Sequence, residues 1–217
     1  MPENAPSGKP QLKPALGVRR LLLVTTGTAS TAFLPFWLNW LRDGYPDLQV
    51  RAAMTASAQR FVTAQTVSLL LGIDVTHDCW PDQARPRALH VELAEWAEAS
   101  AVFPASAHFI TRLALGICDT PVMMALQCTS RPIGLAPSVP PGLEANPVYR
   151  AHLKALGRRP NVAVCRTIVG RGATTGRNEP GVAAPMWELI RLIEKRRLAL
   201  AGTESEPADA RPAAADP

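Results

Sequence analysis

The stretch from Ala101 to Asp119 constrains the fold more than any other part of the chain. A short apolar run, 101–103, stops at Pro104, and the small residues after it lead into a helical pattern. The apolar residues of that pattern share one helix face: Ile110, Leu113, Ala114 and Ile117. This order predicts a strand, a tight turn and a helix start. In open α/β sheets, ligands bind at such turns, outside the carboxyl ends of the strands.

Small side chains occupy the turn itself. Ala105, Ser106 and Ala107 have little bulk, so a flat ligand could lie against the backbone there. The free N–H groups of a helix start favour an anion or an electron-rich ring edge. An ordinary strand-to-helix turn explains the same local pattern, because small residues are common at such turns.

A second strand, turn and helix lie near the start of the chain. The run 19–26 reads as a buried strand, and Gly27, Thr28, Ala29 and Ser30 turn into a helix that carries Phe33, Phe36, Trp37, Trp40 and Leu41. Backbone N–H groups and two hydroxyls could meet a phosphate at this helix start. A serine or threonine that simply caps the helix remains an equal alternative. The tryptophans could serve either the core or an interface.

The alternation continues along the chain. We expect a strand over 48–55, a helix opening over 56–61, strands over 121–127, 132–136 and 162–165, and a closing amphipathic helix over 185–200. Alternating strands and helices favour a parallel sheet. The predicted fold class is α/β: a doubly wound parallel sheet, Rossmann-like and flavodoxin-like, with helices on both faces. We expect one domain over 18–200, with a disordered arm over 1–17 and a disordered tail over 201–217.

Composition narrows the class of function. The formal charge is +5, but the basic residues are scattered and form no stripe with interleaved aromatic residues, so we do not expect nucleic-acid binding. The four cysteines form no C-x-x-C pair and no metal-ligand spacing with histidines, so no metal is expected. No apolar run reaches the roughly 18 residues of a membrane span, and no secretory signal opens the chain. These features predict a cytoplasmic protein with reduced thiols.

The amino-acid sequence of the central segment resembles that of a known family. Pro-Ala-Ser-Ala at 104–107, the helix ending Gly-Ile-Cys-Asp at 116–119, and His90 fourteen positions before Pro104 resemble the homo-oligomeric flavin-containing cysteine decarboxylases. The resemblance runs from about Arg19 to about Leu200. Asn146-Pro147 is similar to the lantibiotic (lanthipeptide) branch, with the microbisporicin type as one candidate within it. The resemblance implies FMN, with FAD conceivable, and a homotrimer or a homododecamer with flavin clefts between subunits.

The resemblance also implies roles for individual residues. The flavin contacts it implies are Gly27, Thr28, Ser30, Thr55, Ser57, Phe61, Pro104, Ala105, Ser106 and Ala107. The family's catalytic histidine stands at the place of His90, in a similar His-Val-x-Leu context. A histidine can take and return a proton near neutral pH, as a thiol oxidation requires. His77 and His152 match no motif and are expected at the surface.

Two positions depart from the family pattern. Asparagine usually follows Pro-Ala-Ser-Ala, whereas this chain has His108, which could stack near the flavin ring or contact the substrate. The family's Pro-x-Met-Asn motif aligns with 137–140, so Pro140 takes the place of the catalytic asparagine. Proline cannot bind a substrate carboxylate through its side chain, and that role must be absent or supplied elsewhere. Asn146 resumes the lantibiotic-like pattern and is a candidate substrate contact.

A polar, glycine-rich loop is predicted over 166–180. It is longer than usual connections, which favours function or disorder. The loop resembles the family's substrate clamp, and Arg171 or Arg177 could pair with a peptide carboxylate through two hydrogen bonds. A solvated loop without function explains the composition equally well.

The activity implied by the resemblance is oxidative decarboxylation of a C-terminal peptidyl cysteine. Hydride loss from the β-carbon to oxidised flavin gives a thioaldehyde, carbon dioxide leaves, and an aminoenethiol forms on the route to S-aminovinyl-cysteine. The partners that the resemblance implies are a lanthipeptide precursor and the other lanthipeptide modification enzymes. Three other interpretations stay open: a phosphopantothenoylcysteine decarboxylase of coenzyme A synthesis, a catalytically silent flavin-binding regulatory protein, and a prenylated-flavin synthase.

Overall fold

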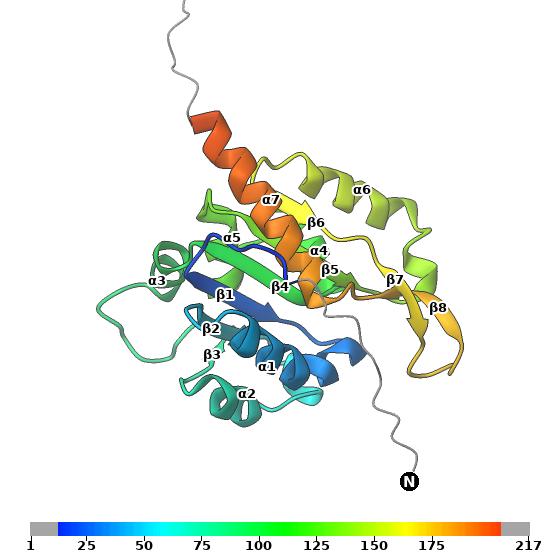
Figure 1. Cartoon of the computed structure of the whole chain (residues 1–217), viewed down its shortest axis with the longest axis horizontal. Coiled ribbons are helices and arrows are strands. Elements are labelled where there is room, and N and C mark those ends of the chain that lie inside the picture. The colour runs from blue at the N-terminus through cyan, green and yellow to red at the C-terminus, as the bar shows by residue number, and fades with distance from the viewer. Residues whose placement is uncertain (1–12, 205–217) are drawn as a thin grey trace, which may run out of the picture.

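A six-stranded parallel sheet forms the centre of the molecule (Figure 1). The computed structural model describes residues 13–204. The strand order is β3-β2-β1-β4-β5-β6, and every neighbouring pair runs parallel. The strands are β1 (Arg20–Thr25), β2 (Gln49–Met54), β3 (Thr76–His77), β4 (Ala99–Ser106), β5 (Ile133–Ser138) and β6 (Val162–Val164). The predicted α/β fold with a doubly wound parallel sheet is confirmed.

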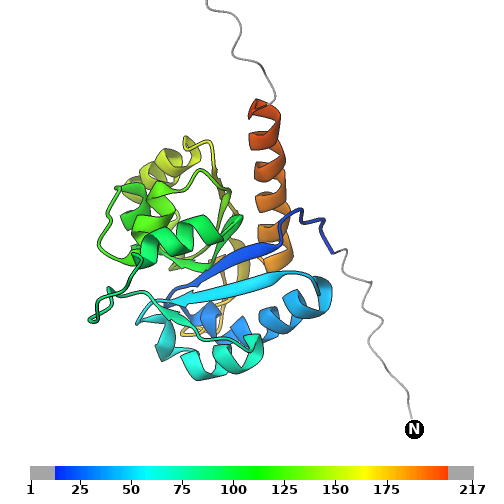
Figure 2. The ribbon, with the colours of Figure 1, turned by 90° about the vertical axis from the view of Figure 1, so that its left-hand side faces the viewer.

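Helices cover both faces of this sheet (Figure 2). One face packs against α1 (Leu34–Gly44), α2 (Ala64–Leu71) and α7 (Met186–Glu204). The other packs against α3 (Leu89–Trp96), α4 (Ala107–Ala114), α5 (Pro121–Cys128) and α6 (Pro147–Gly157). Short 3-10 turns add η1 (Ala29–Phe33), η2 (Ala58–Arg60) and η3 (Pro141–Leu143). Because both faces are covered, the central strands are apolar throughout: seven of the eight residues of β4 are buried.

The chain reverses its direction of strand addition between β1 and β4. The order runs outward from β1 to β2 and β3 on one side, and from β4 to β5 and β6 on the other. This is the topological switch point, where the loops that leave the carboxyl ends of the two strands diverge and open a crevice. The turns at 26–30 and 105–108 therefore lie where a ligand site is expected.

The strand predicted over 121–127 is wrong, because the segment forms α5. Thr120 caps the helix, with its side chain accepting a hydrogen bond from the Met123 N–H at 3.4 Å, and Pro121 occupies the first helical position. The segment contains Met, Ala, Leu and Gln, all good helix formers, and only one β-branched residue. The cap and the proline outweigh the apolar run, which by itself does not distinguish a buried strand from a buried helix.

Two further expectations need local correction. The helix expected to open over 56–61 is only the short turn η2, and α2 begins at Ala64 after Thr63 caps it. The loop expected over 166–180 contains an antiparallel hairpin, β7 (Ile168–Arg171) and β8 (Asn178–Val182). The glycines of this segment hide both strands in the sequence, because glycine weakens the strand pattern without preventing pairing.

The start of the described chain lies against the domain. Within the arm expected over 1–17, the ammonium of Lys13 lies 4.4 Å from the Tyr45 ring centroid, and the Tyr45 hydroxyl donates to the Pro14 carbonyl at 2.7 Å. The Gly17 N–H donates to Glu194 on α7 at 2.9 Å. Residues 1–12 and 205–217, which hold most of the predicted arm and tail, lie outside the described residues. Within 13–204, no helix combines the length and apolarity needed to cross a bilayer.

Candidate active site at the carboxyl edge of the sheet

Hydroxyl groups stand at the carboxyl ends of β1 and β4. Thr26, which follows β1, donates to the Pro104 carbonyl at 2.7 Å and accepts from the Ser106 N–H at 2.8 Å. Ser106 in turn caps α4 by accepting from the Phe109 N–H at 3.3 Å. This buried threonine therefore fixes the turn between β4 and α4. The turn predicted over 104–107 is wrong in its extent: β4 resumes its pairing with β5 at Ala105 and Ser106 after a register shift, and passes directly into α4 at Ala107.

The turns after β1 and β2 press against each other. A Cβ on Gly27 would lie 2.6 Å from Ser57 Cβ and 2.8 Å from the Ser57 carbonyl carbon. The Thr55 and Ser57 hydroxyls are 3.1 Å apart, and the Thr55 N–H donates to the Thr25 carbonyl at 3.1 Å. Glycine at 27 is thus required by close approach, and it brings the predicted residues of both turns together.

Ser30 links this group to β5. Its hydroxyl lies 3.1 Å from that of Ser138, the last residue of β5, and Ser138 is the register partner of Ser106. Two hydroxyls that share one hydrogen bond keep a second proton and several lone pairs for a ligand. We call Thr28, Ser30, Thr55, Ser57 and Ser106 together the hydroxyl cradle. The sequence analysis missed Ser138, although its place at the end of a strand was a usable signal.

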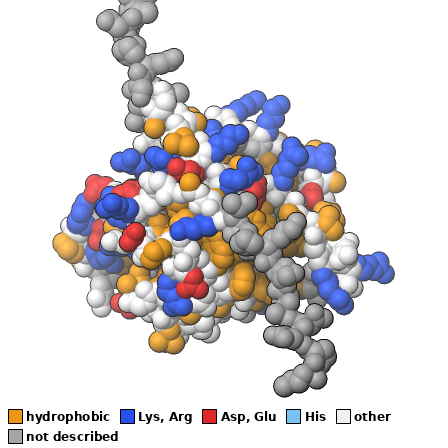
Figure 3. All heavy atoms as spheres, viewed as in Figure 1, with side chains coloured by type: hydrophobic (Ala, Val, Ile, Leu, Met, Phe, Trp, Pro, Cys, Tyr) orange, Lys and Arg blue, Asp and Glu red, His pale blue; other side chains and the backbone are white. Residues whose placement is uncertain are grey.

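Apolar rings border the hydroxyl cradle. Phe61 follows η2 and is 43% exposed, while Phe33 and Phe36 at η1 and α1 are more exposed still, at 66% and 59%. Trp37 is half-buried, with its ring centroid 5.3 Å from that of Trp187 and 5.8 Å from that of Phe103. On the face seen in Figure 3, apolar side chains gather near the centre and Lys and Arg lie mostly around them.

His90 lies in the first turn of α3. Its Nδ1 atom is buried and makes no hydrogen bond within the described residues. The ring of Trp80 stands edge-on to the imidazole, with centroids 5.8 Å apart and planes at 75°. His90 is thus partly buried beside an aromatic ring and placed at a helix start on the α3–α6 face of the sheet.

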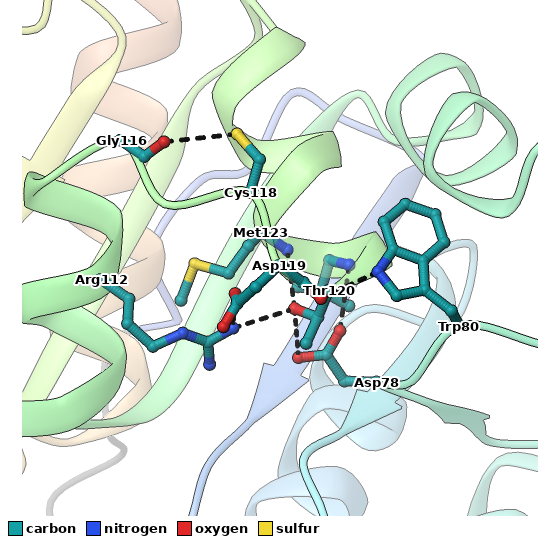
Figure 4. Close-up of polar contacts among 9 residues, drawn as sticks. Asp78, Trp80, Arg112, Gly116, Cys118, Asp119, Thr120 and Met123 are labelled. Carbon is teal, nitrogen blue, oxygen red and sulfur yellow. Dashed lines mark hydrogen bonds and ion pairs between the residues drawn. The ribbon is translucent and has the colours of Figure 1, made fainter.

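A polar network beside His90 escaped the sequence analysis. Asp78, directly after β3, accepts from the Val122 N–H at 3.0 Å and from the Thr120 hydroxyl at 3.1 Å. Arg112 forms an ion pair with Asp119 and donates to Thr120 at 3.3 Å (Figure 4). Burial raises the pKa of Asp78, and the two donors partly oppose that rise. The only sequence signal was Thr120-Pro121, which predicts a helix start.

Asp119 connects this network to the second histidine of the site. The hydrogen bond from Arg112 lowers the pKa of Asp119, and the charges of Arg112 and His108 lower it further. His108 is exposed in the first turn of α4. Asp119 therefore lies between the two histidines, near His108 on one side and bonded on the other to the Trp80 ring that meets His90.

Asn146 caps α6, which limits its other roles. Its side-chain oxygen accepts from the N–H groups of Val148 and Tyr149, at 2.9 and 3.2 Å. Only the amide nitrogen remains to meet a substrate. Pro140 is exposed and precedes η3, with φ of −60°, the angle that proline prefers.

The two candidate clamp arginines flank the tip of the β7–β8 hairpin. Arg171 ends β7, and Arg177 precedes β8, with the Gly172 N–H donating to the Arg177 carbonyl at 2.8 Å. Both side chains are exposed, and neither forms an ion pair with another residue in 13–204. Two cations free to meet an anion are therefore held on one short turn. No three His, Cys, Asp or Glu residues of the described chain cluster as metal ligands.

Comparison with known proteins agrees with this architecture. The profile of the Flavoprotein family matches residues 11–197. The chain belongs to the Flavoprotein family. A curated relative, the cypemycin cysteine dehydrogenase (decarboxylating) of a Streptomyces species, is 32% identical over 165 residues, which are 73% of this chain and 85% of the relative.

Two solved structures extend the similarity to the whole fold. The crystal structure of the cypemycin decarboxylase CypD has a TM-score of 0.68 at 28% identity, covering 84% of this chain and 96% of CypD. The FMN-dependent cysteine decarboxylase TvaF from thioviridamide biosynthesis has a TM-score of 0.66 at 26% identity, covering 84% of this chain and 99% of TvaF. This Flavoprotein member therefore shares its sheet and helices with proteins named as cysteine decarboxylases.

Proposed function

We propose that this flavoprotein is an FMN-dependent peptidyl-cysteine decarboxylase. Its substrate would be the C-terminal cysteine of a lanthipeptide precursor, and its product the aminoenethiol that leads to S-aminovinyl-cysteine. The observation that carries the proposal is the 32% identity to the cypemycin cysteine dehydrogenase (decarboxylating) over 85% of that protein. A microbisporicin-type peptide is one candidate substrate within this class.

The hydroxyl cradle fits the flavin. Thr28 and Ser30 stand at the start of η1, Thr55 and Ser57 at η2, and Ser106 at α4. Hydroxyls and N–H groups at such turns suit a phosphate, and the close approach at Gly27 leaves no room for a larger residue on that side. Ala107 is partly exposed and would leave space for a flat ring, with Phe61 as a wall, whereas Pro104 and Ala105 are buried behind it. FMN requires no more than this, whereas FAD would need a further site for its adenosine.

His90 is the residue that we assign to proton handling. Bound flavin would supply the two-electron oxidation, and the protein would supply orientation and proton transfer. The His90 imidazole accepts the proton of the substrate thiol and returns a proton later in the cycle. Its buried Nδ1 has no described partner, so the other ring nitrogen is the one available to a substrate.

The hairpin arginines are assigned to the substrate. Each guanidinium can bind a carboxylate through two parallel hydrogen bonds, and Arg171 and Arg177 are exposed and unpaired within the described chain. His108 at the start of α4 and the amide nitrogen of Asn146 are further candidate contacts. The group that replaces the family asparagine at Pro140 would come from this set.

Exposed rings support assembly into a homotrimer or a homododecamer. Phe33 and Phe36 follow the turn after β1, Phe61 follows the turn after β2, and all three rings are too exposed for an isolated subunit to shield. A neighbouring subunit that covers them would also close the crevice. Light scattering of the purified protein should therefore give a multiple of three subunits.

One assay tests the proposal directly. Aerobic incubation with a peptide ending in cysteine should lower the peptide mass by about 46 Da, the sum of carbon dioxide and two hydrogens. His90→Asn should lower kcat by about 10²- to 10⁴-fold while flavin stays bound. Unchanged turnover in that variant would remove His90 from the chemistry, and turnover of phosphopantothenoylcysteine in place of the peptide would reassign the substrate.

The clamp is tested by a second pair of variants. Arg171→Ala and Arg177→Ala should each raise KM for the peptide by about tenfold or more, since each removes a charge-assisted contact. Arg158→Ala, which removes an exposed arginine at the end of α6, is the matched control and should leave KM unchanged. Equal KM values in all three variants would refute the clamp assignment.

A further inference from the structure

The orientation of His90 requires an explanation, because no hydrogen bond fixes its ring. Catalytic histidines usually have one ring nitrogen held by a carboxylate or a carbonyl. Here Nδ1 is buried and makes no such bond among the described residues. The Trp80 ring contacts the imidazole in the edge-to-face arrangement that aromatic pairs prefer.

Trp80 is itself held by a polar contact rather than by burial. Its side chain is 44% exposed, so the core does not fix the indole plane. The indole Nε1–H donates to the Asp119 carbonyl at 2.8 Å, in the connection between α4 and α5. This single bond, drawn in Figure 4, ties the ring that faces His90 to the opposite segment.

The opposite segment is fixed at two points. Two residues before Trp80, Asp78 accepts hydrogen bonds from Thr120 and from the Val122 N–H. The Asp119 side chain is paired with Arg112, whose own side chain is only 11% exposed. Hydrogen bonds of Asp78 and of Trp80 therefore join residues 78–80 to residues 119–122, and we call this linkage the Asp78–Trp80 clasp. The clasp links the carboxyl end of β3 to the starts of α3 and α5.

We propose that Trp80 is a positioning residue for His90, which the Asp78–Trp80 clasp holds in place. This inference rests on the proposed role of His90 in proton transfer. The indole limits rotation of the imidazole about its χ angles, and the Asp119 carbonyl limits rotation of the indole. Trp80 does not exchange protons itself. Its loss should slow the chemical step without weakening capture of the flavin or the peptide.

The kinetic test compares three variants. Trp80→Leu removes the ring and should lower kcat by about three- to tenfold, with KM, bound flavin and the melting midpoint unchanged. Trp80→Phe keeps an aromatic ring but loses the N–H donor, so its kcat should lie between those of Trp80→Leu and the unaltered protein. Trp96→Leu is the control and should retain full kcat, because Trp96 lies on α3, the helix that carries His90, but its ring stacks on Arg51 instead.

A magnetic resonance measurement tests the contact without relying on turnover. The carbon-bound proton signals of the His90 ring, assigned by their loss in His90→Asn, should be displaced by the indole ring current. They should move in Trp80→Leu and stay in place in Trp96→Leu. Signals that do not move refute the positioning role even if no peptide is turned over. Normal kcat in Trp80→Leu, or equal losses in Trp80→Leu and Trp80→Phe, would also overturn it.

Discussion

The close approach of Gly27 to Ser57 gives the sharpest test of the hydroxyl cradle. Gly27→Ala would place a methyl group 2.6 Å from Ser57 Cβ and 2.8 Å from its carbonyl carbon. One of these atoms is backbone, so the turns after β1 and β2 must separate. Overpacking of this kind costs about 1–3 kcal/mol. For a domain of this size, that cost should lower the melting midpoint by roughly 2–10 °C.

The same separation should weaken flavin binding. Each 1.4 kcal/mol lost from the bound state raises the Kd by about tenfold, so a rise of about five- to hundredfold is expected if the strain falls mainly on the site. Differential scanning fluorimetry gives the midpoint, and quenching of FMN fluorescence gives the Kd. Gly157→Ala is the matched control, because nothing lies within 4 Å of the added methyl group at the end of α6.

A double variant separates side-chain from backbone strain. Adding Ser57→Gly to Gly27→Ala removes the Cβ and Oγ contacts but keeps the backbone contact. The melting midpoint of the double variant should therefore stay below that of Ser57→Gly alone, but by less than Gly27→Ala lies below the unaltered protein. If Gly27→Ala matched the unaltered protein in both midpoint and Kd, the two turns would not touch as described, and the assigned cradle would be wrong.

Three further perturbations follow from the packing. Gly181→Ala should destabilise the hairpin by more than 1 kcal/mol, because φ is +102° and the new Cβ would strike the Val139 carbonyl oxygen; faster proteolysis within 168–182 is the measurement, and an unchanged rate would contradict it. Burial raises the pKa of the Cys165 thiol to about 12, so maleimide at neutral pH should label the exposed Cys79 and Cys128 and spare Cys165 until the protein unfolds. The hydrogen bond from Arg197 lowers the pKa of Glu194 below its ordinary 4.5, so its contribution is present above that value and lost as pH falls through the lowered pKa; Glu194→Gln should flatten the melting curve against pH in that acid range, and an unchanged acid dependence would show that Glu194 is not the group.

Much of the fold could be predicted because burial leaves a local mark. β1 and β4 are buried on both faces, so their sequences show apolar runs that end in small or polar residues, whereas β2 is buried only over its last three residues. The alternation of such runs with helical patterns is enough to predict a parallel sheet. The error at 121–127 arose from the same signal, since a short apolar run is compatible with either structure and only the cap at Thr120 separates them.

Residues of the candidate site were predictable only where they are consecutive in the sequence. The passage from strand to helix at 104–107 is contiguous and was predicted, although not its extent, whereas the Asp78–Trp80 clasp joins residues about forty positions apart. Neither Asp78 nor Asp119 carries a local pattern that reveals its partner. Ser138 is a similar case, since its hydrogen bond to Ser30 spans 108 positions. Contacts of this kind depend on the register of the sheet, which local pattern does not determine.

The segment after β5 shows how one departure from the family pattern can be accommodated. The Val139 N–H donates to the carbonyl of Gly181 in β8 at 2.8 Å, and Thr167, just before β7, contacts Glu144. The residues around Pro140 therefore form the base of the β7–β8 hairpin. A proline fits there because its φ is already suitable and its missing N–H costs no bond in an exposed position. This base holds the β7–β8 hairpin in place, and with it the exposed Arg171 and Arg177 at its tip, to which the proposed clamp assigns the substrate.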